Sequence, residues 1–156
     1  MSHQSQRSHS GYRQGSRRSV PDECLNKNLN KIITGSDSAE QLVKCADKLG
    51  KYLAPTVTTS QIRAWFGEVK QIEAQWKSGQ KDKAERRLIL LKPKMAYRAA
   101  RQEKSRKGPL HDLKNLLDEA IDFVHSSPDK DQSFANFVAF FEAILAYHKA
   151  HGGKDN

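Results

Sequence analysis

The sequence predicts an all-α fold, a single compact bundle of about five helices in residues 22–156. Three observations support this prediction. Apolar residues recur at spacings of three and four along most of the chain, prolines and glycines separate the periodic stretches, and no run alternates with the period of two that a strand requires. A chain of 156 residues is long enough for one domain with its own core.

The first two predicted helices begin at residues that can cap them. Asp37 or Ser38 can cap the first, whose apolar positions are Leu42, Val43, Ala46, Leu49 and Leu53. A hydroxyl residue at 58–60 can cap the second, whose apolar stripe is Ile62, Phe66, Val69, Ile72 and Trp76. Gly67 lies inside this second helix, where glycine costs about 1 kcal/mol relative to alanine, so we expect a close contact that needs its small size.

Two further helices are predicted around the break at Gly108. One runs from Lys81 to Gln102, and Pro93 is expected to kink or restart it because proline lacks the amide hydrogen. The next has a single apolar face formed by Leu113, Leu116, Leu117, Ala120, Ile121 and Val124.

The last predicted helix begins at Asp131 and is apolar over two adjacent stripes. The first stripe is Phe134, Phe137, Val138, Phe141, Ile144, Leu145 and His148, and the second is Phe140, Ala143 and Tyr147. So wide an apolar surface indicates either a helix at the centre of the bundle or one that contacts another protein. Dimerisation of the free chain therefore stays open.

Positive charge is concentrated in one middle segment and one tail. Residues 61–107 contain fourteen lysines and arginines against five acidic residues, and their net charge of +9 equals that of the whole chain. Residues 1–21 add four arginines and no acid, whereas residues 108–156 carry a net −4. Segregated positive charge on a folded core indicates a polyanionic partner, most often nucleic acid.

The composition of the chain also predicts the character of its N-terminal tail and its compartment. Residues 1–21 are rich in Ser, Gln, Arg and Gly and lack periodic apolar residues, so we expect a basic, flexible tail. No apolar signal segment opens the chain, and no run reaches the ~20 apolar residues of a membrane span. We expect a cytoplasmic protein without a membrane partner.

Signatures of enzymes are absent from the sequence. It contains no GxSxG, Walker, GxGxxG or HExxH motif. His148 and His151 lie one turn apart, but no further ligand completes a metal site, so a pair at a helix end is the simpler interpretation. Glu142 lies within the most apolar helix and can pair with a basic residue of a neighbour. We expect no catalysis, small-molecule substrate, cofactor or metal.

Helical spacing predicts a cationic surface for RNA phosphates. Three cations follow Pro93 at spacings of four and three on one helix face, and two more share a face of the preceding helix. Tyr97 lies among them and can stack on a base or sugar. The complete set of candidate RNA-binding residues is Arg63, Lys70, Lys92, Lys94, Tyr97, Arg98, Arg101 and Lys104.

A solvated, salt-bridged helix surface is the competing interpretation of these cations. It requires acids interleaved at i±4, and only Glu103 lies between Lys92 and Lys107. No zinc-finger, RRM or KH signature is present, so the pattern favours contacts to the phosphate backbone over contacts that read base sequence.

Three blocks of sequence resemble the small, all-helical subunit of type III-A CRISPR effector (Csm) complexes. They are TTSQIR at 58–63, LKPKMAY at 91–97 followed by Arg101, and FFEAILAYHK at 140–149. They occur in the order and at the spacing of that family. The third block is the most specific, and its apolar character fits core packing or contact between copies better than RNA binding.

The resemblance implies a non-catalytic RNA-binding subunit of an antiviral ribonucleoprotein. Several copies would stack along the guide RNA paired with its target RNA, beside the other subunits that carry the catalytic activities. By motif position, the contacts to RNA would come from Arg63, Lys92, Lys94 and Arg101. Lys70 and Arg98 are added by the charge geometry alone.

Three other functions stay open from the residues. A free-standing DNA-binding helical protein is the first, with the turn at 78–80 leading into a recognition helix, although the following helix looks buried. The second is an enzyme with an unrecognised site at His148 and Glu142. The third is a helical scaffold that binds only protein, for which partner binding would be insensitive to salt.

Overall fold

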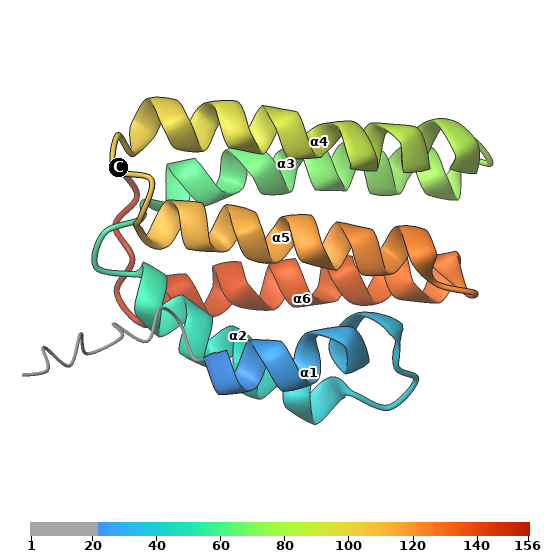
Figure 1. Ribbon diagram of the computed structural model, residues 1–156, viewed down its shortest axis with the longest axis horizontal. Coiled ribbons are helices and arrows are strands. Elements are labelled where there is room, and N and C mark those ends of the chain that lie inside the picture. The colour runs from blue at the N-terminus through green and yellow to red at the C-terminus, as the bar shows by residue number, and fades with distance from the viewer. Residues whose placement is uncertain (1–21) are drawn as a thin grey trace, which may run out of the picture.

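The computed structural model describes the backbone of residues 22–156 and the side chains of residues 28–156. This part of the chain consists of helices and contains no strand, which confirms the predicted all-α class (Figure 1). The helices are α1 (Asp22–Thr34), α2 (Ala39–Leu53), α3 (Thr59–Lys77), α4 (Lys81–Gln102), α5 (Pro109–Ser126) and α6 (Lys130–Ala150). The predicted tail at 1–21 lies outside the described residues.

The described chain has six helices where about five were expected, and α1 is the additional one. Leu29, Ile32 and Ile33 are fully buried on its inner face. Their spacing is helical, and Gly35 follows directly as a stop signal. This helix is absent from the sequence-based prediction because the segment is short.

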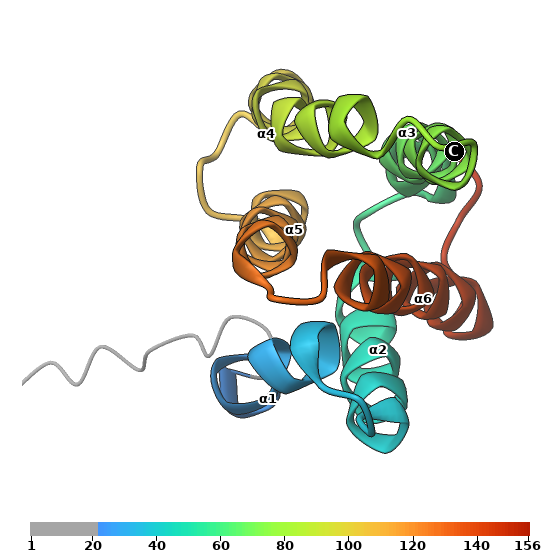
Figure 2. The same ribbon diagram turned by 90° about the vertical axis from the view of Figure 1, so that its right-hand side faces the viewer.

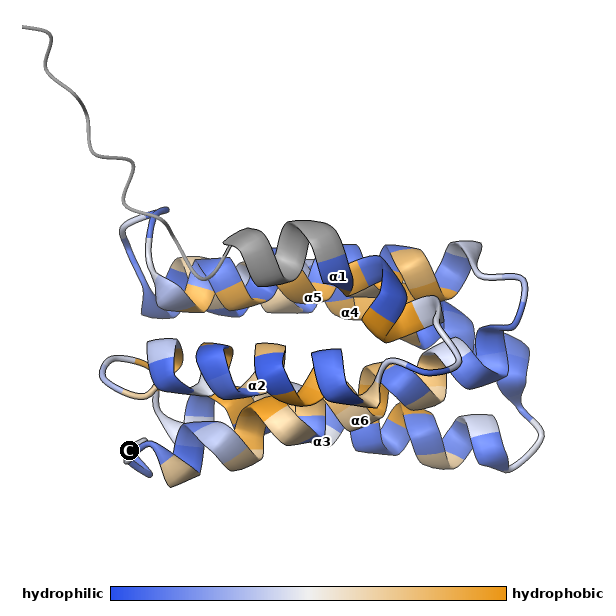
Figure 3. Cartoon of the chain, turned by 90° about the horizontal axis from the view of Figure 1, so that it is seen from below, coloured by the Kyte–Doolittle hydropathy of each residue, from blue (hydrophilic) through white to orange (hydrophobic). Residues whose placement is uncertain are grey.

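Helices α3 to α6 form a four-helix bundle, and α1 and α2 cover one side of it. α3 and α5 each pack against both α4 and α6, so the four helices close a ring (Figure 2). α1 and α2 pack against α5 and α6 on the outside of this ring. In Figure 3 hydrophilic and hydrophobic residues recur in turn along α2 and α5, as expected for helices that bury one face and expose the other.

Helix α6 lies at the centre of the molecule. It packs against α1, α2, α3 and α5. Phe140 of its second apolar stripe is fully buried, and Ala143 and Tyr147 pack against the core. The structure therefore shows a central helix whose two stripes are covered largely by this chain's own helices.

The contact between α2 and α6 is a close approach of two backbones. A Cβ atom built on Gly50 would lie 2.5 Å from the backbone nitrogen of His148. The His148 ring is fully buried, and its Nε2 lies 2.6 Å from the carbonyl oxygen of Val57. His151 instead contacts Asp47. The two histidines thus have separate structural contacts.

The structure decides two local expectations in part. Helix α4 is continuous through Pro93, so it does not restart there, and Leu91 and Met95 on either side are buried. Gly67 does not occupy a tight site, since a Cβ atom there would meet nothing within 4 Å. Its small size is not required by packing inside this chain.

The N-terminus of α3 has its amide groups well paired. Thr58 accepts a hydrogen bond from the backbone nitrogen of Gln61, whose side chain accepts one from the backbone of Thr58. The amides of Thr59 and Ser60 donate to carbonyl groups of residues 154 and 155 at 2.8 and 3.1 Å. The C-terminal segment therefore covers the start of α3.

Thr58→Ala should lower the free energy of unfolding by about 1 kcal/mol, because it removes the capping hydroxyl. Urea unfolding followed by circular dichroism measures this change. Thr56→Ala is the matched control, since Thr56 is exposed and caps no helix. Equal stability of the two variants would contradict the role of the cap.

Candidate nucleic-acid interface

The basic middle segment folds into the antiparallel hairpin of α3 and α4. The chain reverses at Gly79, whose φ of +88° lies in the left-handed region that favours glycine. Helix α4 then returns along α3 and packs against it on one side and against α5 on the other. Cations distant in sequence are thereby placed on one side of the molecule.

The two predicted cations of α3 are both exposed but have different surroundings. Lys70 Nζ donates a hydrogen bond to Glu73 Oε1 at 2.6 Å, so its charge is partly balanced. Arg63 has no ion pair with a described residue. It lies near Asp155, whose pKa is held below its usual value first by the hydrogen bond from Lys149 and to a smaller extent by Arg63.

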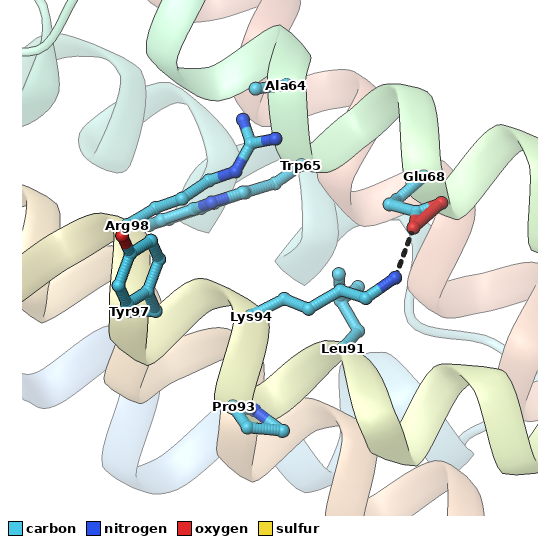
Figure 4. Close-up of a pocket in the computed structure, with 8 residues that line it drawn as sticks. All are labelled: Ala64, Trp65, Glu68, Leu91, Pro93, Lys94, Tyr97 and Arg98. Atoms are coloured by element: carbon cyan, nitrogen blue, oxygen red, sulfur yellow. Dashed lines mark hydrogen bonds and ion pairs between the residues drawn. The ribbon is translucent and has the colours of Figure 1, made fainter.

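Glu68 of α3 is an acidic centre between the two helices. Its carboxylate accepts a hydrogen bond from Lys94 at 2.7 Å (Figure 4) and another from Arg87 at 2.8 Å. The Lys94 hydrogen bond lowers the pKa of Glu68 from its usual value, against the opposing effect of burial. The charge of Lys94 is therefore partly balanced by the Glu68 carboxylate of this chain.

A groove of about 520 Å³ lies between α3 and α4 next to this ion pair. Its lining residues are Ala64, Trp65, Glu68, Leu91, Pro93, Lys94, Tyr97 and Arg98. Tyr97 is 65% exposed, whereas Trp65 is only 2% exposed. In Figure 4 the Arg98 side chain extends from α4 toward Ala64 on α3. The groove thus combines aromatic walls with cations.

Lys92 does not belong to the same face as Lys94. Two residues along an α-helix turn the side chain by about 200°, which directs Lys92 toward α5. There it forms an ion pair with Asp122. Lys92 therefore lies on the α5 side of α4 beside an acid, and its contact with RNA stays a prediction.

Arg101 lies in the last turn of α4 and Lys104 lies just beyond its end, and both are exposed. Lys104 lines a second groove of about 440 Å³ between α4 and α5, together with Ala96, Ala100, Glu103, Arg106, His111, Lys114 and Asn115. The one acid there, Glu103, accepts hydrogen bonds from the backbone nitrogens of Leu110 and His111 at 3.3 Å. The Glu103 carboxylate thus pairs with backbone amides at the N-terminus of α5.

The structure divides the predicted set by charge pairing. Ion pairs engage Lys70, Lys92 and Lys94. No ion pair with a described residue engages Arg63, Arg98, Arg101 or Lys104. The acids that pair with Lys92 and Lys94 come from other helices, so residue spacing along α4 does not reveal these two ion pairs. The apolar stripe predicted for α3 also omitted Trp65, which is buried next to the half-buried Phe66.

Glu68→Gln should release Lys94 and Arg87 toward solvent and raise the affinity for RNA several-fold at low salt. The slope of log K against log salt should steepen by about one unit for each released cation that meets a phosphate. Fluorescence anisotropy at several salt concentrations measures both values. Glu119→Gln, an exposed acid on α5, is the control for net charge. Equal effects of the two substitutions would contradict a local role for Glu68.

The side chains on this hairpin can bind an anion with aromatic groups attached. Arginine offers forked donors to phosphate, and tyrosine offers a face for stacking. Among residues 28–156, no group of three His, Cys, Asp or Glu side chains is placed to hold a metal ion. None of the described helices combines the length and apolar character that a membrane span needs.

Comparison with known proteins identifies one family. The family model described as Csm2 Type III-A matches residues 36–154, from the start of α2 to the segment that covers α3. Neither curated proteins nor solved structures gave a match. The matched region includes the α3–α4 hairpin and the three blocks that resembled this family. The chain therefore belongs to the Csm2 Type III-A family, the small structural subunits of type III-A CRISPR effector complexes.

Proposed function

We propose that this chain binds RNA through the exposed side of the α3–α4 hairpin and does not itself catalyse a reaction. The observation that carries the proposal is the set of cations that have no ion-pair partner among residues 28–156: Arg63, Arg98, Arg101 and Lys104. Lys70 and Lys92, by contrast, are paired with acids of this chain. Unpaired arginines and lysines on one side of the fold favour a phosphate backbone.

Membership of the family implies partnership with the other subunits of a Csm complex. The finer part of the proposal concerns RNA and copies of this chain. Several copies would lie side by side along the guide RNA and its paired target, each contacting phosphates without reading sequence. Such a ribonucleoprotein acts in antiviral defence in the cytoplasm.

The test is fluorescence anisotropy with single-stranded RNA, an RNA duplex and a DNA duplex of equal length, each at several salt concentrations. We expect RNA binding that weakens steeply as salt rises, because bound cations displace counterions from phosphates. Absence of RNA binding at low salt would contradict direct contact by the free chain. Salt-insensitive binding would favour a protein partner.

Preference for duplex DNA would support a free-standing DNA-binding protein instead. The turn at Gly79 leads into α4, which buries Leu88 and Leu91 on its inner face and exposes its outer face. A recognition helix has to expose one full side to enter a major groove, so the comparison of RNA with duplex DNA decides between the two functions.

A further inference from the structure

The groove between α3 and α4 has the size and lining of a site for a small aromatic ligand. Its volume of about 520 Å³ falls in the range of roughly 300–1,000 Å³ that is typical of ligand pockets. Leu91 and Pro93 contribute aliphatic walls, and Lys94 and Arg98 contribute positive charge. Phosphate alone would not need a concave surface with aliphatic and aromatic walls.

Trp65 supplies an unused hydrogen-bond donor in this groove. Its Nε1 atom is buried and has no hydrogen-bond partner among the described residues. A buried donor without a partner is unfavourable, so an acceptor that reached it would be bound selectively. In Figure 4 the Arg98 side chain lies alongside Trp65. Arg98 has no hydrogen bond to a described residue, so it can turn outward and uncover the indole.

Tyr97 supplies a free aromatic face at the rim of the same groove. It is 65% exposed. The ring contacts between described residues involve other aromatic side chains and not Tyr97. Glu68 is the one acid in the lining, and its charge is balanced by Lys94 and Arg87. A negatively charged ligand can therefore approach without meeting an unpaired carboxylate.

We propose that this groove holds one unpaired nucleobase of the bound RNA. The base stacks on Tyr97, an oxygen of the base accepts a hydrogen bond from Trp65 Nε1, and the adjoining phosphate contacts Arg98. This inference rests on the proposed RNA binding and adds a base contact to a surface that otherwise contacts phosphates.

The test compares two RNA probes of equal length and charge, an oligouridine and a fully abasic ribose–phosphate chain, by fluorescence anisotropy with the full chain. We expect the oligouridine to bind about tenfold more tightly, the usual gain from stacking one base. Tyr97→Ala should remove most of this difference, because it should weaken binding of the oligouridine far more than binding of the abasic chain. Leu90→Ala should preserve the difference, because Leu90 is an exposed residue of α4 outside the groove.

Tryptophan fluorescence gives an independent measurement. The chain has two tryptophans, so Trp76→Phe leaves Trp65 as the sole reporter. Quenching by oligouridine but not by the abasic chain would support a base in the groove. Equal affinities for the two probes, or equal losses for both in Tyr97→Ala, would overturn the base site while phosphate binding stands. Failure to bind either probe would contradict the proposed function itself.

Discussion

Arg98→Glu combined with Arg101→Glu should lower the affinity for RNA by about a hundredfold at low salt. Both arginines are exposed on the same side of α4 and have no ion pair with a described residue. Each lost charge-assisted contact is worth about 1.5 kcal/mol or more, and each 1.4 kcal/mol is a factor of about ten. Fluorescence anisotropy with single-stranded RNA measures the loss.

Lys48→Glu combined with Lys51→Glu is the matched control. These lysines are exposed on α2, away from the hairpin, and the double substitution changes the net charge by the same amount. We expect it to weaken RNA binding only a few-fold, through the long-range field. Equal losses in the two double variants would show that net charge, and not the α3–α4 surface, governs binding.

Gly50→Ala should lower the free energy of unfolding by about 3 kcal/mol, the upper part of the range for overpacked cores. The added Cβ would lie 2.5–2.6 Å from backbone and Cβ atoms of Tyr147 and His148. These atoms belong to the central helix and cannot move aside as a flexible side-chain end can. Urea unfolding followed by circular dichroism provides the measurement.

Gly67→Ala is the matched comparison within a helix, because its Cβ would meet nothing within 4 Å. It should raise the free energy of unfolding by about 1 kcal/mol through helix propensity. Destabilisation by Gly67→Ala, or wild-type stability of Gly50→Ala, would contradict the packing described for α2, α3 and α6.

The class of the fold could be predicted because apolar spacing and breakers agree along most of the chain. Val69, Ile72 and Ile144 are buried as their periodicity predicts. The helix from Lys81 to Gln102 was predicted, but the rules for proline could not decide whether it restarts at Pro93, where the structure shows one continuous helix with buried neighbours on both sides. Local sequence rules do not include such tertiary support.

The candidate interface could be predicted only in part. Spacing along one helix correctly groups Lys94, Arg98 and Arg101 on one side of α4. It cannot show which acids approach from other helices, so the pairing of Lys92 with Asp122 was missed. The groove floor at Trp65 was also missed, because one helical period fits either Trp65 or its neighbour Phe66, and only the packed structure decides between them.

Ultraviolet cross-linking of single-stranded RNA to the purified chain, with the adducts mapped by mass spectrometry, tests the central claim most directly. RNA contact by the α3–α4 hairpin predicts adducts on Tyr97 or on peptides from the second half of α4. The same experiment at high salt should lose them, because phosphate contacts are screened. Adducts confined to α2, α6 or residues 1–21 would contradict the assignment of RNA binding to this hairpin.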